Sequence, residues 1–281
     1  RELLTDPEID VVSVASYDDA HFDQIRTALE HGKHVFAEKP LVLYADQARQ
    51  IAGLLAERPD LVLSTNVPLR RSPRFVRLRD RIQAGELGRL FLMEADYEYG
   101  RRHKLEQGWR ADIPYYSAFL GGGIHMVDLL LWLTGERVTE VLGAHANRIA
   151  TEGSGFKHPD LVTATMRTET GALMKVNANL GSVGPHFHAV RLYGTDATFV
   201  NGLPDGVLHR PEGVSEVVDD PYPGVGKEVL IGSFLDAILT GEPAQVTARD
   251  VFDTLSVCMA VQHALETGET VPVEDLLPST G

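Results

Sequence analysis

Short apolar stretches alternate with helical stretches over the first 65 residues, and this order limits the possible fold more than any other feature. Residues 9–16 are almost continuously apolar and β-branched, which is typical of a strand buried on both faces of a parallel sheet. Residues 33–37 and 61–65 predict two further strands, and residues 18–31 and 45–57 predict the helices between them. Such an order predicts half of a doubly wound α/β sheet.

After residue 66, predicted strands follow one another with few helices between them. Consecutive strands without helices favour antiparallel pairing, so we expect an α+β part with a large, mostly antiparallel open sheet. An irregular segment is expected at 112–123. The expected strands are 90–99, 138–149, 160–167, 173–180, 187–193 and 197–201, and the expected helices are 74–84, 125–133, 225–240 and 248–267.

Length and composition exclude several classes of protein. At roughly 150 residues per domain, 281 residues predict two domains or one large one. The net charge of −14 argues against nucleic acid or an anionic membrane as a partner. No apolar run reaches the length of a membrane span, so no membrane partner is expected. The one cysteine, Cys258, excludes an internal disulfide, favours a reducing, cytoplasmic location and lies in an apolar pattern typical of a buried side chain.

Six arginines between residues 70 and 81 form the one basic cluster. We interpret it first as a solvated helix face. The alternative is that one of these arginines holds a cofactor phosphate or a substrate carboxylate.

Five segments, in this order, resemble the Gfo/Idh/MocA family of oxidoreductases (glucose–fructose oxidoreductase and inositol dehydrogenase): residues 4–12, 31–41, 85–89, 121–128 and 232–238. The resemblance covers essentially the whole chain. It implies a partial NAD(P)-binding Rossmann domain at 1–66, a substrate and oligomerisation domain at 67–245, and a C-terminal helix and tail at 246–281 that packs back on the Rossmann domain. It also implies a homodimer or homotetramer formed through the C-terminal sheet.

Members of that family begin with a strand, a Gly-rich turn, a helix and a second strand that selects NAD or NADP. No Gly-x-Gly-x-x-Gly sequence follows a strand here, so we expect the chain to lack roughly 60–70 residues of such a half-domain. The cofactor is therefore expected to be NAD or NADP, and the segment that selects between them is not in this sequence. A protein that truly starts at Arg1 is expected to have little activity and an exposed sheet edge.

The Glu38-Lys39-Pro40 turn follows the strand at 33–37, at the carboxyl end where ligands bind in open α/β sheets. The resemblance places Lys39 beside the nicotinamide, where its ammonium can hydrogen-bond the oxygen being oxidised. The resemblance also implies that Glu38 helps to hold the ribose attached to the nicotinamide. The competing interpretation of Lys39 is a surface lysine in a polar turn.

His125 opens an apolar helix after three glycines, and a histidine there can act as a neutral base. The family pattern Asp-x-Gly-x-His has its aspartate where this chain has Gly121. Asp128, one helical turn on, is a candidate to orient the ring or contact substrate. A structural histidine is the alternative. The groups that could replace the aspartate are Tyr115, Tyr116 and Asp112.

Other candidates are ranked by position. Ser16 and His21, after the first strand, are candidate cofactor neighbours, with helix capping by Asp18 as the competing account. Asn66, at the end of the third strand, is another candidate cofactor neighbour. Substrate contacts are expected from Tyr97, Tyr99, Trp109 and Arg110, against packing under a loop. His186 and His188 lack a third ligand, so no metal is expected, and substrate contact or inter-subunit packing is favoured.

The resemblance therefore implies reversible hydride transfer between NAD(P) and a secondary alcohol of a sugar, inositol or related polyol. Two alternatives stay open. One is an NAD-dependent glycosidase, epimerase or transferase that passes through a transient keto sugar. The other is a non-catalytic binding protein that kept the fold.

Overall fold

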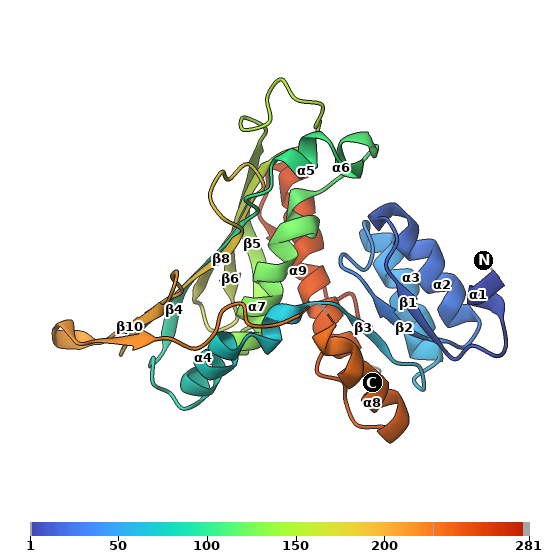
Figure 1. Ribbon diagram of the computed structural model, residues 1–281, viewed down its shortest axis with the longest axis horizontal. Helices are drawn as coiled ribbons and strands as arrows, with labels where there is room; N and C mark the ends of the chain where they lie inside the picture. Colours follow the sequence, from blue (N-terminus) through green and yellow to red (C-terminus); the bar gives the residue numbers. More distant parts are fainter. Residues whose placement is uncertain (1, 227, 278–281) are drawn as a thin grey trace. The chain divides into compact units, whose positions relative to one another are not determined.

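The computed structural model describes residues 2–226 and 228–277, which group into two compact units (Figure 1). Unit 1 contains Arg1–Pro68, Gly226–Met259 and Glu274–Gly281, and unit 2 contains Leu69–Val225 and Ala260–Val273. Residues 226–245, which the sequence interpretation grouped with the second domain, thus contact unit 1. The physical reason is packing: the Phe234 ring lies 5.5 Å from that of Phe36 in the parallel sheet.

Unit 1 is built on three parallel strands in the order β1 (Val11–Val14), β2 (His34–Ala37) and β3 (Leu63–Thr65). Helices α2 (His21–Glu30) and α3 (Ala45–Glu57) connect them, and the short α1 (Glu2–Thr5) precedes them. The predicted α/β order is confirmed. The expectation of burial on both faces is wrong for β1, because the Ser13 side chain is exposed.

The helices of unit 1 have the amphipathic spacing that the sequence predicted. Ile25 and Leu29 of α2 and Ile51 and Leu55 of α3 are buried. Gly32, with a φ of 73°, ends α2 in the left-handed conformation that glycine adopts without strain.

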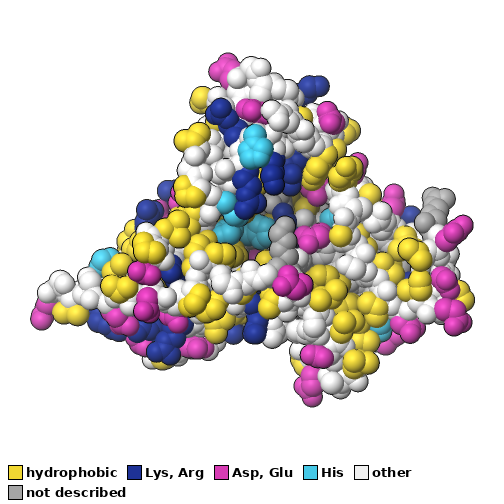
Figure 2. All heavy atoms as spheres, viewed as in Figure 1, with side chains coloured by type: hydrophobic (Ala, Val, Ile, Leu, Met, Phe, Trp, Pro, Cys, Tyr) yellow, Lys and Arg dark blue, Asp and Glu magenta, His cyan; other side chains and the backbone are white. Residues whose placement is uncertain are grey.

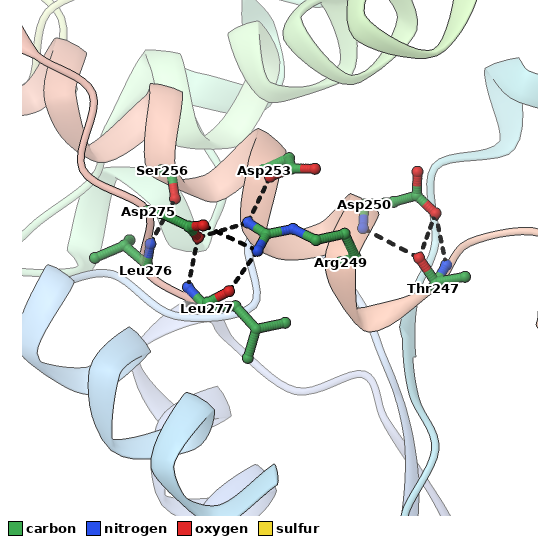
Figure 3. A network of polar contacts seen from close by, with 8 residues as sticks. All are labelled: Thr247, Arg249, Asp250, Asp253, Ser256, Asp275, Leu276 and Leu277. Carbon is green, nitrogen blue, oxygen red and sulfur yellow. Dashed lines mark hydrogen bonds and ion pairs between the residues drawn. The ribbon is translucent and has the colours of Figure 1, made fainter. Parts of the chain in front are cut away.

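The C-terminal segments of unit 1 are α8 (Val229–Thr240), the Ala248–Met259 part of α9 (Ala248–Thr267), and residues 274–277. Figure 3 shows the polar network that joins the last two: Arg249 binds the carboxylates of Asp253 and Asp275 and the carbonyl of Leu277. Thr247 and Asp250 bond each other's backbone N–H at the start of α9, which is a capping box. Cys258 is buried in this helix, as predicted.

Unit 2 is built on a nine-stranded sheet within the described part of the chain, in the order β11-β10-β9-β8-β4-β7-β6-β5-β12. The pair β4–β7 is parallel and the other strand pairs of this sheet are antiparallel, which confirms the predicted mostly antiparallel sheet. The strands are β4 (Leu90–Glu98), β5 (Val138–Asn147), β6 (Leu161–Thr168), β7 (Leu173–Asn179), β8 (Phe187–Gly194), β9 (Thr198–Val200), β10 (Gly206–His209), β11 (Ser215–Val218) and β12 (Val271–Pro272).

One face of this sheet carries α4 (Pro73–Gln83) and α7 (Ile124–Thr134) (Figure 1). Burial alternates along β4: Met93 and Ala95 are buried, whereas Glu94 and Asp96 between them are only half-buried. A strand with this alternation has one covered face and one open face. The short helices α5 (His103–Glu106) and α6 (Trp109–Asp112) lie in the connection between β4 and α7.

The segment before α7 departs from expectation, because Phe119–Gly123 form a π-helical turn (η3) rather than an irregular stretch. A β-carbon added to Gly121 would stand 2.3 Å from the Tyr116 hydroxyl, and one added to Gly122 would stand 2.5 Å from the Tyr97 ring. The glycines therefore allow two tyrosines to press against the helical backbone, an approach that a larger residue would prevent.

The predicted basic cluster is partly internal. Arg70 and Arg74 are 4% and 1% exposed, so the interpretation as a solvated face is wrong for these two. Arg74 donates to the side chain of Asn201 and to the carbonyls of Gly202 and Pro204. Arg74 therefore ties α4 to the segment that follows β9.

None of the helices in the described ranges is both long enough and apolar enough to cross a membrane.

Candidate functional site

The candidate site in unit 1 lies at the carboxyl ends of its three parallel strands. Because the strands are parallel, the residues that follow them meet at one edge of the sheet. Ser16, Glu38 and Asn66 each follow one of these strands. The structure therefore brings together the cofactor-binding residues that the sequence predicted for this edge.

The backbone on either side of Lys39 is held in place. The Glu38 N–H donates to the carbonyl of Val14, 2.8 Å away, which continues the β1–β2 ladder by one residue. The Asn66 side-chain amide donates to the Glu38 carboxylate at 2.8 Å. The Lys39–Pro40 peptide is cis, Lys39 is half-buried and Pro40 is buried. Hydrogen bonds therefore hold the backbone that precedes Lys39, and the Lys39 side chain is half-buried rather than fully exposed.

The side-chain oxygen of Asn66 is available as a hydrogen-bond acceptor for a bound molecule. Its Nδ2 is bound to Glu38, and its backbone N–H donates to Ala37, 3.1 Å away. Its Oδ1 is buried and has no hydrogen-bond partner among the residues that the structure describes. A buried acceptor of this kind is best satisfied by an N–H or O–H of a bound molecule.

His21, the first residue of α2, is only 1% exposed. Its Nδ1 lies 2.7 Å from the carbonyl oxygen of Pro40, and its Nε2 lies 3.2 Å from that of Ser16. The ring therefore joins the loop after β1 to the turn after β2. Asp18 lies in the short 3₁₀ turn that precedes α2, whose N-cap residue is Ala20.

The candidate site in unit 2 centres on His125. Its imidazole stacks on the Tyr97 ring, with centroids 5.6 Å apart and planes 15° from parallel. The sequence interpretation placed His125 at a helix N-terminus. The structure corrects this, because η3 runs directly into α7 and the first amides of the helical segment precede residue 121.

Further aromatic side chains surround Tyr97. Tyr99 stacks at 6.2 Å, and the imidazoles of His186 and His188 lie at 5.3 and 5.5 Å between ring centroids. Burial raises the pKa of the Tyr97 phenol, with the phenols of Tyr116 and Tyr99 adding to the effect. Tyr97 is therefore a neutral, buried surface against which His125 packs.

His188 is held neutral by its surroundings. Its pKa is lowered to about 3, chiefly by burial, with the neighbouring His186 and Arg101 adding to the effect. The Tyr222 hydroxyl lies 2.6 Å from its Nδ1 and accepts the His188 backbone N–H at 2.9 Å. Tyr222 was missed by sequence reasoning, since nothing in its local pattern marks it.

The His186 and His188 rings are 4.7 Å apart. Within residues 2–226 and 228–277, no group of three His, Cys, Asp or Glu side chains is arranged to hold a metal ion. On the face shown in Figure 2, histidine side chains lie together with Lys and Arg side chains.

Trp109 and Arg110, two predicted substrate contacts, lie together beside Tyr116. The Arg110 guanidinium is 4.4 Å from the Trp109 ring centroid, and its Nε donates to the Tyr116 hydroxyl at 3.2 Å. Of the three groups considered in place of the aspartate, Tyr116 is the one whose hydroxyl occupies the side-chain space of Gly121. Tyr115 instead accepts a hydrogen bond from Gln262 at 2.6 Å, and Asp112 is exposed.

A hollow of about 610 Å³ adjoins this group within unit 2. It is lined by residues of the 115–118 segment, of β5 and β6, of the end of α9 from Gln262, and by Gly268 just after that helix. Its size is that of a small-molecule site.

Asp128 is 2% exposed and forms an ion pair with Arg70, with 2.7 Å between the charged atoms. Its carboxylate accepts three hydrogen bonds from that guanidinium. The structure therefore places Asp128 in the interior of unit 2.

Comparison with known families finds two matches. Residues 1–66 match an oxidoreductase family with an NAD-binding Rossmann fold, and residues 75–200 match the GFO/IDH/MocA C-terminal domain. A 1,5-anhydro-D-fructose reductase from Ensifer adhaerens is 27% identical over 98% of this chain and 83% of that protein. Inositol 2-dehydrogenase 2 from Saccharopolyspora erythraea is 25% identical over 97% of this chain and 79% of that protein.

Among solved structures, levoglucosan dehydrogenase in complex with NADH is similar with a TM-score of 0.85. The superposition covers 98% of this chain and 82% of that one, at 20% sequence identity. At this identity the likeness shows a shared fold.

Proposed function

Because the chain belongs to the GFO/IDH/MocA oxidoreductase family, we propose that it moves a hydride between NAD or NADP and a secondary alcohol of a sugar, inositol or related polyol. The observation that carries this proposal is the turn around Lys39, held at the carboxyl ends of parallel strands by Val14, Asn66 and His21. The names of the relatives support the substrate class.

Lys39 and His125 are the proposed catalytic residues. The Lys39 ammonium would donate a hydrogen bond to the alcohol oxygen and stabilise the negative charge that develops there. His125, in unit 2, is a group of the kind that can accept a hydroxyl proton and return it in the reverse direction. The nicotinamide, when bound, supplies the hydride acceptor.

The residues at the strand ends of unit 1 fit the nicotinamide end of such a cofactor. The Glu38 carboxylate can accept a hydrogen bond from a ribose hydroxyl. The buried Asn66 Oδ1 can accept one from an N–H or O–H of the cofactor. Ser16 follows β1 at the same edge. The sequence holds no Gly-x-Gly-x-x-Gly, so we assign no residue to the diphosphate.

In unit 2 we propose Tyr97, Trp109 and Arg110 as substrate contacts, with Tyr116 in place of the aspartate of the family pattern. The Tyr116 hydroxyl stands about as far from a β-carbon on Gly121 as an aspartate's own carboxylate oxygens would. Arg110 donates to that hydroxyl and can stabilise negative charge on it. We assign Asp128 a supporting role, since its carboxylate is bound to Arg70.

We further propose that the chain forms a homodimer or homotetramer through the open face of the nine-stranded sheet. This face carries paired polar side chains, such as Lys175 and Glu94 at 3.4 Å, and the exposed ring of Phe91. A face with its own complementary charges suits an interface in which the same surface meets itself.

The test is an assay of the full-length protein against aldoses, inositols and sugar acids with NAD and with NADP, followed by absorbance at 340 nm. We expect reduction of cofactor with at least one of these substrates. Lys39→Met should lower kcat by about 100-fold or more, because it removes the donor to the reacting oxygen. Lys104→Met, which changes an exposed lysine, should leave kcat unchanged.

Two results would count against the proposal. Absence of any absorbance change across the panel would exclude the dehydrogenase reaction. Conversion of a sugar with no net change in the cofactor would favour the glycosidase or epimerase alternative.

A further inference from the structure

We propose that His21 is a positioning residue for Lys39: its ring holds the carbonyl of Pro40 and so sets the backbone from which Lys39 projects. The inference deepens the proposed function and rests on the role given there to Lys39. It assigns His21 no contact with substrate or cofactor.

The geometry places His21 between two loops of unit 1. Its Nδ1 lies 2.7 Å from the Pro40 carbonyl oxygen, and its Nε2 lies 3.2 Å from the Ser16 carbonyl oxygen. Carbonyl oxygens only accept hydrogen bonds, so the ring donates to them, through one N–H as neutral imidazole or through both as imidazolium. The shorter contact is the one to Pro40.

Pro40 depends on this contact more than another residue would. Proline has no backbone N–H, so its carbonyl is the one main-chain polar group by which the structure can hold it. Pro40 is buried, and a buried carbonyl without a donor is unfavourable. If the ring were removed, we expect the turn to shift until this carbonyl reaches water.

Such a shift would move the backbone of Lys39. The Glu38 N–H is bound to Val14 on the preceding side of Lys39, and Pro40 is bound to His21 on the following side. Lys39 is thus fixed by a hydrogen bond on each flank. Loss of one flank allows the backbone at Lys39 to shift, and misplacement of a catalytic group by about 1 Å can cost about 100-fold in rate.

The alternative interpretations of His21 fit the geometry less well. A cofactor contact or a catalytic base needs a ring nitrogen directed at the ligand. Both ring nitrogens of His21 face main-chain carbonyls, and the side chain is 1% exposed. We therefore infer that His21 acts through Lys39.

Two substitutions separate the two ring nitrogens. The side-chain amide nitrogen of asparagine stands near the Nδ1 position, and that of glutamine stands near Nε2. His21→Asn should keep the bond to Pro40, and His21→Gln should keep the bond to Ser16. We expect His21→Asn to retain kcat within about threefold, and His21→Gln and His21→Ala to lose about 100-fold in kcat with KM for the cofactor little changed.

A second readout does not need activity. Reductive ¹³C-methylation of the lysines makes the Lys39 methyl resonance visible by NMR, and Lys39→Arg identifies it. In His21→Ala and His21→Gln this resonance should shift, and in His21→Asn it should stay near its wild-type position. Melting temperatures of the same variants show whether each is folded.

The outcomes distinguish this inference from the proposed function. If folded His21→Ala protein keeps the wild-type Lys39 resonance, or if Asn and Gln variants lose kcat equally, His21 does not position Lys39. If the resonance responds as expected but Lys39→Met retains full activity, the tie between His21 and Pro40 stands and the catalytic role of Lys39 falls.

Discussion

His188 is buried, and its ring contacts those of His186 and Tyr222. Placing a charge there would cost solvation and would meet the positive charge of Arg101, which is why its pKa falls from 6.5 to about 3. The folded protein therefore keeps His188 neutral at any pH at which an enzyme of this kind would be assayed.

This neutrality makes stability depend on pH. Above pH 6.5 His188 is neutral in the folded and the unfolded chain. As the pH falls from 6.5 toward 3, His188 becomes protonated in the unfolded chain but stays neutral in the folded protein. The free energy of unfolding therefore falls over this range. We expect a loss of about 2 kcal/mol between pH 7 and pH 5 from this residue.

His188→Asn removes the titration and keeps an acceptor for the Tyr222 hydroxyl. Urea unfolding at pH 7 and pH 5 should show that this variant loses less stability on acidification than the wild type. His145→Asn, at an exposed position of β5, is the control and should behave like the wild type. Equal losses in wild type and His188→Asn would contradict the assignment.

At the scale of elements, the η3 turn depends on glycine. Gly121→Ala would push a methyl group against the Tyr116 hydroxyl, and we expect a loss of about 1–3 kcal/mol in the free energy of unfolding. Combining it with Tyr116→Phe should recover part of the loss. Gly53→Ala in α3 is the matched control, because an added β-carbon there meets nothing within 4 Å and should stabilise by up to about 1 kcal/mol.

Denaturant unfolding measures all three variants. If Gly121→Ala were as harmless as Gly53→Ala, the close approach of Tyr116 to the helix would be wrong, and with it the support for Tyr116 in place of the missing aspartate.

The long elements and the Lys39 turn could be predicted because their signals are local. The spacing of apolar residues predicted α3 and α9 to the residue. The position of Lys39 follows from the order of strand and turn alone. In contrast, β10 and β11 are four-residue strands in a segment rich in glycine and proline, and their pattern is too short to stand out.

The surroundings of the candidate residues were not predictable for a different reason. Tyr222 meets His188 across 34 residues, and Arg70 meets Asp128 across 58. Such pairs depend on the register of the sheet and on how helices pack over it. The same is true of His21, whose candidate role changed from cofactor neighbour to support of the Pro40 carbonyl once its two acceptors were known.

For the whole molecule, the proposed assembly predicts a change in mass. Phe91 on β4 is 51% exposed and its ring lies 6.4 Å from that of Tyr193. Phe91→Arg should lower the mass measured by light scattering from a dimer or tetramer to a monomer, because it places an unpaired charge in the proposed interface. Val183→Arg changes an 88% exposed apolar residue in a loop and should leave the mass unchanged. A wild-type protein that stays monomeric at all concentrations would exclude the interface.

The central place of β4 has a consequence for how the chain is made. β4 is the first strand of unit 2 to leave the ribosome, yet its neighbours are β7 and β8. The side-chain hydrogen bond between Asp96 and Asn177 spans 81 residues of sequence, and the one between Glu94 and Tyr193 spans 99. Closing loops of this length before any pairing is gained slows folding. During synthesis, β4 must therefore remain unpaired until β7 and β8 have emerged, and in this interval its exposed backbone is open to pairing with other chains.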